Sequence, residues 1–357
     1  MKTSLLCKAG LAAIAVLTVF SCASPNTSNV GERIAALDDS AWSSSEWISA
    51  ADAEVVTVKV PDDRWHAASG ASWFVSSVKN EGKVVSAKWM TSGLGVYDIY
   101  VNGCLVGNEF LKPGFTHYEK TKYSFTYDIT EAFNTGSGAE NVLAAQVTPG
   151  WWADKIITPG GKIGMNGKKC AFRGVLELVY NDGTRKYYGT DLDNWKAGIA
   201  GPVKHSAIFD GEYYDARVQP GYADADKLGR PEVNTEFEGV IRPSDGAEIY
   251  LRHDLTISPV RTYVWKDIEG AKEGEYGKVV INAEYVQDQE VVLQPGETMV
   301  VDFGQNAAAV PEFVFKAAEG TVLTCLPSEI LNDGNGAESR GMDGPEGSCH
   351  RTNLRAH

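Results

Sequence analysis

The stretch that decides the fold is GVYDIYVNGCLVG, residues 95–107. Between Tyr97 and Val101, apolar residues occupy every second position, which is the pattern of a strand with one buried face. Asn102-Gly103 follows directly, and this dipeptide tolerates the positive φ angles of a type I′ turn. The stretch therefore predicts an antiparallel hairpin.

Similar short runs, rich in Val, Tyr, Phe and Thr, recur along the chain between turn signals, and no long amphipathic helix interrupts them. They include VVTVKV (55–60), SWFVSSV (72–78), VVSAKWMTS (84–92), KYSFTYDIT (122–130), NVLAAQV (141–147), GVLELVY (174–180) and RKYYGT (185–190). This pattern predicts an all-β protein built from antiparallel sandwiches or jelly rolls.

The chain of 357 residues is long enough for two domains. A break in the strand pattern follows Arg217, where a Gly- and Pro-containing stretch has few periodic apolar residues. The final stretch has almost no large apolar residue and is predicted to be a truncated or disordered tail. The predicted division is a jelly roll at 41–218, a connector at 219–238, a second β-sandwich at 239–331 and the tail at 332–357.

The composition is that of a folded globular protein, with 43% hydrophobic and 22% charged residues. The net charge of −14 disfavours a nucleic-acid partner, which requires a basic surface. Nine Trp and fifteen Tyr supply flat faces that suit sugar rings. The alternative is that the cores of two β-sandwiches use these aromatic residues.

The N-terminus, MKTSLLCKAGLAAIAVLTVFSCASPN, has basic residues followed by an apolar run at 9–20. That run is too short to span a bilayer and predicts a signal peptide at 1–21. VFSC (19–22) resembles a bacterial lipoprotein processing site, in which Cys22 would carry the lipid. The chain would then be extracytoplasmic, anchored in the periplasm or at the outer-membrane surface through a tether at 22–40. The alternative is a plain secretory signal in which Cys22 has no role.

Beyond the predicted signal peptide and Cys22, four cysteines remain, which are Cys104, Cys170, Cys325 and Cys349. Their wide spacing contains no C-x-x-C and indicates neither a zinc site nor a dense disulfide framework. Buried free thiols are predicted, although the compartment would permit a disulfide whose pairing the spacing does not reveal.

The candidate binding residues lie around TPGWWADK, residues 148–155. Neighbouring side chains on an extended backbone point to opposite sides, so Trp151 and Trp152 cannot both face a core. The exposed ring could stack on a sugar beside Asp154 and Lys155, or it could pack on another domain. Tyr118 completes this candidate carbohydrate site.

No nucleophile elbow, metalloprotease helix or phosphate loop occurs in the sequence. Two acidic pairs, Glu212 with Asp215 and Glu329 with Asp333, could in principle act as the acid and base of a glycosidase. The first pair is better explained as an ion-paired corner with Arg217. No catalytic residue is predicted.

Five segments, in the same order, resemble the N-terminal half of bacterial α-L-rhamnosidases, a family of inverting glycoside hydrolases. They are AWSSSEWISA (41–50), GVYDIYVNGCLVGNEFLKPGFTHYEKTKYSFTYDIT (95–130), PGWW (149–152), NWKAGIAGPVKHSAIFDGEYYDAR (194–217) and VVDFGQNAAAVPEFVFKAAEGTVLTCLPSEIL (300–331). The resemblance implies a galactose-binding-like jelly roll followed by a concanavalin-like β domain. The family's acid and base lie in a later (α/α)₆ barrel, which this sequence does not reach, so the chain is expected to be inactive alone.

Some members of the family bind rhamnose on such a jelly roll with a calcium ion. Here Lys120 and Lys122 flank Glu119, which disfavours a cation, so no metal or cofactor is predicted. The leading hypothesis is an accessory, non-catalytic part of an α-L-rhamnosidase-like hydrolase in plant-polysaccharide breakdown. Its partners would be a rhamnose-containing oligosaccharide or polysaccharide, the catalytic barrel, and a membrane through the lipid anchor. The alternatives are a stand-alone carbohydrate-binding lipoprotein and a purely structural scaffold for domain docking.

Overall fold

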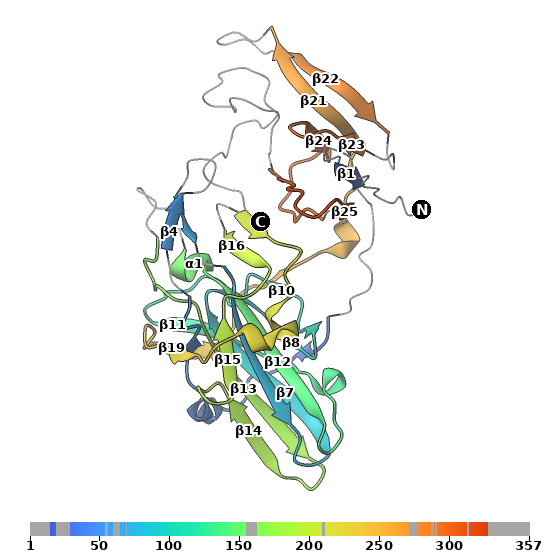
Figure 1. Cartoon of the computed structure of the whole chain (residues 1–357). Coiled ribbons are helices and arrows are strands. Elements are labelled where there is room, and N and C mark those ends of the chain that lie inside the picture. The colour runs from blue at the N-terminus through green and yellow to red at the C-terminus, as the bar shows by residue number, and fades with distance from the viewer. Residues whose placement is uncertain are drawn as a thin grey trace. The chain divides into compact units, whose positions relative to one another are not determined.

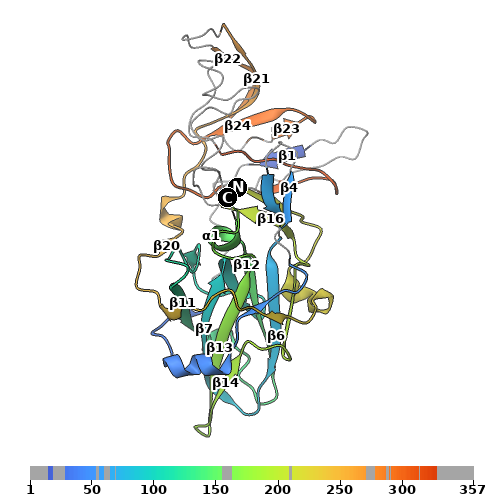
Figure 2. The same cartoon turned by 90° about the vertical axis from the view of Figure 1, so that its left-hand side faces the viewer.

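The computed structural model describes two compact units, which we treat separately (Figures 1 and 2). The jelly-roll unit comprises Thr27–Leu251, and the C-terminal unit joins Met1–Asn26 with Arg252–Arg355. The described residues are 15–18, 29–53, 56–59, 65–68, 70–154, 163–208, 211–270, 278–286, 289, 291–312 and 314–327. Strands dominate both units, which confirms the predicted all-β fold. No helix among these residues is long and apolar enough to cross a membrane.

The jelly-roll unit packs an eight-stranded sheet against a five-stranded sheet. The larger sheet has the order β18 (Glu232–Val233), β3 (Ile48–Ser49), β13 (Ala171–Tyr180), β7 (Val84–Leu94), β11 (Thr121–Asp128) and β19 (Val240–Pro243), with β14 (Arg185–Gly189) on β13 and β2 (Glu32–Arg33) on β11. The smaller has the order β15 (Trp195–Gly198), β6 (Ser72–Lys79), β12 (Glu140–Thr148), β8 (Val96–Val101) and β9 (Cys104–Leu105). Successive strands cross between the sheets, as in a jelly roll. Among the described strands of these two sheets, β11 with β19 is the one parallel pair.

Smaller elements complete this unit. They are the pairs β4 (Val56–Lys59) with β5 (Trp65–Ala68), β16 (Val203–Ala207) with β17 (Gly211–Tyr214) and β10 (Glu109–Phe110) with β20 (Ile249–Tyr250), the helix α1 (Gly150–Ala153), and the 3₁₀ turns η1 (Asp39–Ser44), η2 (Thr130–Ala132), η3 (Gly221–Ala223) and η4 (Ala225–Lys227).

Phe172 on β13 is the centre of the core between the two sheets. Its ring lies 5.9 Å from that of Phe74 and 5.7 Å from that of Trp195, both on the smaller sheet. On its own sheet, its centroid lies 6.1 Å from that of Trp89. The alternating apolar residues of β8 also point into this core, which explains why the opening stretch reads so clearly as a strand.

The outer face of the larger sheet is buried as well. On β11, Phe125 and Tyr127 face the core between the sheets, whereas Lys122, Ser124 and Thr126 point to the other side and are nonetheless buried. Loops and short helices therefore form a further layer over this face. One part of it places Trp42 over Met90 and Val175; another includes Trp152 of α1 and Phe237.

The stretch after Arg217 differs from the predicted division, because residues 219–238 lie within the jelly-roll unit. Tyr222 of η3 packs on Trp73 with 5.6 Å between ring centroids, and Leu228 belongs to the same cluster. The strand β19 also belongs to this unit through its pairing with β11. A few well-placed apolar residues are enough to fix a segment that has no periodic pattern.

The C-terminal unit contains two three-stranded antiparallel sheets. Their orders are β22 (Lys278–Tyr285), β21 (Arg261–Glu269), β24 (Thr298–Asp302) and β23 (Val291–Leu293), β1 (Ala15–Thr18), β25 (Val314–Lys316), with the turn η5 (His253–Leu255) preceding β21. Val264 of β21 and Val291 and Leu293 of β23 form a small core that joins the two sheets. The strand β1 lies within the predicted signal peptide.

The Asn-Gly turn of the opening hairpin is fixed by its own side chain. Asn102 adopts φ 51°, and its Oδ1 accepts a hydrogen bond from the Val142 amide at 2.9 Å. Its Nδ2 donates to the Ala132 carbonyl and to Oδ1 of the buried Asn141, both at 2.9 Å. The turn thus ties β8 to β12 through side-chain contacts as well as through the ladder.

We expect Asn102→Ala to lower the free energy of unfolding by about 2–4 kcal/mol, because three hydrogen bonds are lost and a non-glycine residue without a polar side chain must keep a positive φ. Urea denaturation of the full chain would measure this. Asn181→Ala, in an exposed turn, is the control and should change stability by less than about 0.5 kcal/mol. Equal effects of the two substitutions would show that the Asn102 contacts contribute little.

Candidate functional site

The two adjacent tryptophans lie on α1, a single helical turn. Gly150 begins this turn with φ 48°, and a Cβ there would lie 2.6 Å from a methyl carbon of Val96. Trp152 is buried and its indole Nε1 donates to the Lys169 carbonyl at 2.9 Å, whereas Trp151 is half-buried. The expected difference between the two rings is present, although a helical turn produces it and not an extended backbone.

Four aromatic residues, Phe115, Tyr118, Trp151 and Trp152, form what we call the aromatic patch. The ring of Phe115 lies 5.2 Å from that of Tyr118 and 6.0 Å from that of Trp151, nearly perpendicular to both. Tyr118 in turn lies 6.0 Å from Trp152. Phe115 is 61% exposed, while Tyr118 and Trp152 are buried. The patch therefore presents a solvent-facing aromatic edge supported by a buried base.

A buried lysine lies under this base. Lys122 Nζ is 3.3 Å from the ring centroid of Tyr118, 4.4 Å from that of Trp152 and 5.7 Å from that of Phe237. The side chain is fully buried, and its amine has no hydrogen-bond partner within the described part of the chain. Burial lowers the pKa of Lys122 to about 6. The lysine is therefore mainly neutral at pH 7 and the base of the patch is an apolar environment.

The segment at 163–170 wraps around Trp152. An added Cβ at Gly167 would lie 2.1 Å from the indole, so only glycine allows this approach. Asn166 Nδ2 donates to the Trp151 carbonyl at 3.0 Å, and the Lys168 amide donates to Glu236 Oε2 at 2.9 Å. Gly167 therefore serves packing against the aromatic patch, whereas Gly164 adopts a positive φ of 64°.

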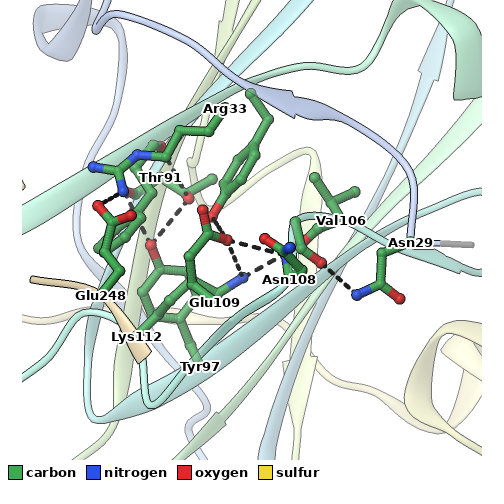
Figure 3. A network of polar contacts seen from close by, with 12 residues as sticks. Asn29, Arg33, Thr91, Tyr97, Val106, Asn108, Glu109, Lys112 and Glu248 are labelled. Atoms are coloured by element: carbon green, nitrogen blue, oxygen red, sulfur yellow. Dashed lines mark hydrogen bonds and ion pairs between the residues drawn. The ribbon is translucent and has the colours of Figure 1, made fainter. Parts of the chain in front are cut away.

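The loop that carries Phe115 and Tyr118 is held at its start by a buried polar network (Figure 3). The Tyr127 hydroxyl donates to Glu109 Oε2 at 2.7 Å, and the Asn108 amide donates to the same oxygen at 3.1 Å. Lys112 Nζ lies 4.0 Å from that oxygen and donates to the Val106 carbonyl at 3.2 Å. Burial lowers the pKa of Lys112, which the nearby acidic charges oppose.

A second pair of charges lies beside this network, where Arg33 forms an ion pair with Glu248. The Arg33 guanidinium also lies over the Phe125 ring, 4.5 Å from its centroid, and donates to the Ser244 carbonyl at 3.2 Å. Segments from the start, middle and end of the jelly-roll unit thus meet at the base of the loop. We infer that this network positions the loop.

The structure brings together three of the predicted site residues, Tyr118, Trp151 and Trp152. Asp154 is buried at the end of α1 and does not face solvent beside them. Lys155 and the predicted lipid-bearing Cys22 lie outside the described residues. The sequence analysis missed Phe115 and the buried position of Lys122. The alternation along β11 could have indicated the buried position of Lys122, since Lys122 lies on the same face of the strand as Ser124 and Thr126.

The other candidate sites, which are metal-binding, acidic and cysteine sites, have weaker support. No group of three or more His, Cys, Asp and Glu that could hold a metal ion occurs in the described ranges. Asp215 forms the expected ion pair with Arg217, with 2.8 Å between Oδ1 and Nε. Glu329 and Asp333 lie outside the described residues. The cysteines Cys104, Cys170 and Cys325 are free thiols; Cys170 is buried as predicted, whereas Cys104 is exposed and Cys325 is partly buried.

A hollow of about 390 Å³ lies at the edge of the sandwich, beside Tyr187, Asp191 and Asn194. Its polar groups bond to one another: Asp191 accepts from the Asn194 amide at 2.6 Å and from its side-chain Nδ2 at 2.8 Å. These groups stabilise the 191–194 turn, so the aromatic patch is the stronger candidate site.

Comparison with known proteins agrees with this architecture. Residues 82–245 match the model of the α-L-rhamnosidase N-terminal domain, and residues 293–357 match that of the bacterial α-L-rhamnosidase concanavalin-like domain. The second match includes the predicted tail, which lies outside the described residues. Together the two matches cover more than half of the sequence, and both matched models describe domains of α-L-rhamnosidases. The chain belongs to the bacterial α-L-rhamnosidase family.

Individual relatives point the same way. An α-L-rhamnosidase of Streptomyces avermitilis is 29% identical over 283 residues, which cover 77% of this chain and 22% of the relative. An α-L-rhamnosidase of Formosa agariphila is 25% identical over 307 residues, which cover 83% of this chain and 29% of the relative. The solved α-L-rhamnosidase of Aspergillus terreus has a similar fold, with a TM-score of 0.53 at 19% identity over 75% of this chain and 33% of that one. The chain thus spans less than a third of the length of these relatives.

We expect the free energy of unfolding to rise with pH because of Lys122. Its pKa is about 6 when folded and about 10.4 when unfolded, so unfolding takes up a proton between these values. Lys122 alone should add about 1.4 kcal/mol to the free energy of unfolding for each unit by which the pH rises within this range. Lys122→Met removes this dependence on pH. The free energy of unfolding of the variant, relative to that of the unmodified chain, should therefore be higher at pH 6.5 than at pH 8.5 by about 2–3 kcal/mol. Lys120→Met, at an exposed lysine, is the control. If the difference in stability between the Lys122→Met variant and the unmodified chain did not change with pH, the folded protein would keep Lys122 charged.

Tyr127→Phe should lower the free energy of unfolding by about 1–3 kcal/mol, because a buried carboxylate loses a donor. In a double-mutant cycle with Glu109→Gln, the two changes should be non-additive by more than about 0.5 kcal/mol. Tyr187→Phe removes a hydrogen bond of 2.9 Å to Glu177 from a more exposed tyrosine and should cost less. Additive effects of the Tyr127 and Glu109 substitutions would contradict the network.

Proposed function

We propose that this chain is the accessory, non-catalytic β portion of an α-L-rhamnosidase-like glycoside hydrolase, and that its aromatic patch binds rhamnose-containing glycans. The observation that carries the proposal is the exposed Phe115 ring beside the half-buried Trp151, supported from below by buried aromatic residues. Sugar sites combine flat aromatic surface with a few polar groups. The family relationship supports rhamnose as the recognised sugar.

The accessory role is supported by the identity of the two matched domains, neither of which is a catalytic domain by its description. In the acidic pair Glu212 and Asp215, hydrogen bonds from Arg217 lower the pKa of Asp215 to about 2, whereas burial raises the pKa of Glu212. Asp215 therefore does not suit the role of an acid that protonates a leaving group, which needs a raised pKa. We further propose that the chain works outside the cytoplasm, attached through Cys22, in the breakdown of plant polysaccharides.

A second role, docking of a further domain, is favoured by the pair β10–β20. Phe110 is 40% exposed and its partner Ile249 is 53% exposed, with Leu251 at 41% close by in sequence. Contiguous exposed apolar residues mark interaction surfaces. In this case the domain that docks would be the catalytic part of the enzyme.

Isothermal titration of the full chain with a rhamnose-containing oligosaccharide tests the main proposal. Phe115→Ala and Trp151→Ala should each weaken binding at least about tenfold, which corresponds to about 1.4 kcal/mol, because each removes a stacking surface. Tyr213→Ala, at an aromatic residue that is 48% exposed elsewhere on the unit, should leave the affinity unchanged.

The same preparation should release no aglycone from an aryl α-L-rhamnoside. Turnover that persists through purification would overturn the accessory role. Sugar binding that is unaffected by Phe115→Ala and Trp151→Ala would remove the aromatic patch as the binding site.

A further inference from the structure

The outer face of the five-stranded sheet carries polar residues that the aromatic patch does not involve. Register places Trp73, Gln146 and Asp98 directly opposite one another on β6, β12 and β8. Residues opposed in this way have Cβ atoms about 4.5–5.5 Å apart and share a face of the sheet. The Asp98 carboxylate and the Gln146 amide are therefore neighbours on this face.

Tyrosines lie around this pair. Tyr100 follows Asp98 on the same face of β8, and its ring lies 5.6 Å from that of Trp73 and 5.2 Å from that of Tyr222. Burial raises the pKa of the Tyr100 hydroxyl, and the Asp98 carboxylate and the Tyr214 phenol nearby raise it further. Tyr214, on β17, is 59% exposed.

Asp98 differs from the other deeply placed carboxylates of the jelly-roll unit. Glu109 accepts from Tyr127 at 2.7 Å, and Glu177 accepts from Arg185 at 2.8 Å. Within the described ranges, the Asp98 carboxylate has neither a hydrogen bond nor an ion pair within 4 Å, and the Gln146 side chain has no hydrogen bond. A carboxylate is rarely left without a partner unless water or a ligand supplies one.

Asp98 is also reached by solvent. Its side chain is only partly buried, yet burial raises the pKa of the carboxyl group, which the charge of Lys112 opposes. The carboxylate is therefore partly desolvated and still accessible. This is the position from which a carboxylate can contact a small ligand.

We propose that this face is a second sugar-binding site, in which the Asp98 carboxylate and the Gln146 amide bind adjacent hydroxyl groups of a neutral sugar. Tyr100 and Tyr214 supply the aromatic surface beside them. An anionic ligand is disfavoured by the carboxylate and by the net charge of −14. A metal ion is disfavoured by the nearby Lys112 and by the lack of further acidic ligands at this place in the described structure.

The test is an NMR titration of the full chain with L-rhamnose and, separately, with D-galactose. The side-chain amide signals of Gln146, assigned with Gln146→Leu, should shift on addition of at least one of the two sugars. Asp98→Asn should weaken that binding at least tenfold. Asp226→Asn, at a fully exposed carboxylate on η4, is the control and should bind as the unmodified chain does.

Stability supplies a second readout, which separates a binding role from a structural one. Because the folded state disfavours the charged carboxylate, Asp98→Asn should leave the thermal midpoint at pH 7 unchanged or raise it. A lower midpoint would show that the carboxylate stabilises the fold and would overturn the proposal. The proposal would also be overturned if neither sugar shifted the Gln146 signals, or if the Asp98→Asn variant bound with unchanged affinity.

The two sites are distinguished by their variants. Trp151→Ala should leave the Gln146 shifts intact, and Asp98→Asn should leave binding at the aromatic patch intact. Binding abolished by Trp151→Ala alone would support the aromatic patch and overturn the second site. Binding abolished by Asp98→Asn alone would support the second site and contradict the role of the patch.

Discussion

Burial of both faces of the eight-stranded sheet is the constraint on which the rest of the jelly-roll unit depends. Its inner face packs on the smaller sheet around Phe172, as in any β-sandwich. Its outer face is also apolar at Met90, Leu94 and Val175, and these positions must be covered. The loops and turns over this face therefore carry large aromatic residues, and the aromatic patch is the part of this layer that reaches solvent. The candidate site follows from how the outer face is covered.

Burial disfavours the charged forms of several ionisable groups in this unit, and two of them, Lys122 and Asp98, are accommodated differently. Lys122 lies between aromatic rings that cover its amine completely, and its low pKa allows it to remain neutral. Asp98 has no such enclosure and keeps access to solvent. The lysine fills space in the core, whereas burial disfavours the charged form of the carboxylate, which the charge of Lys112 opposes. Carboxylates with a raised pKa that stay accessible to solvent are concentrated at functional sites.

The sequence predicted the elements with regular patterns and missed those fixed by single contacts. The alternation in β8 and the Asn-Gly turn predicted the hairpin, and the spacing of short strands predicted the sandwich. The 219–238 segment gave no periodic signal, because its position depends on a few residues such as Tyr222 against Trp73. The tryptophan pair was recognised as unusual, but its neighbours Phe115 and Phe237 come from distant parts of the chain. Their convergence depends on tertiary packing that no local pattern encodes.

Two separate sugar sites on one unit would also bear on the kind of glycan that is recognised. A single shallow site with one or two stacking rings binds a monosaccharide weakly, since few ligand atoms are buried. When two such sites belong to one rigid unit, a polymer bound at the first is held at high effective concentration near the second. The gain exists only for a ligand long enough to reach both sites. An arrangement of this kind would therefore favour an extended polysaccharide over free sugars, because only a chain of linked sugars can occupy both sites at once.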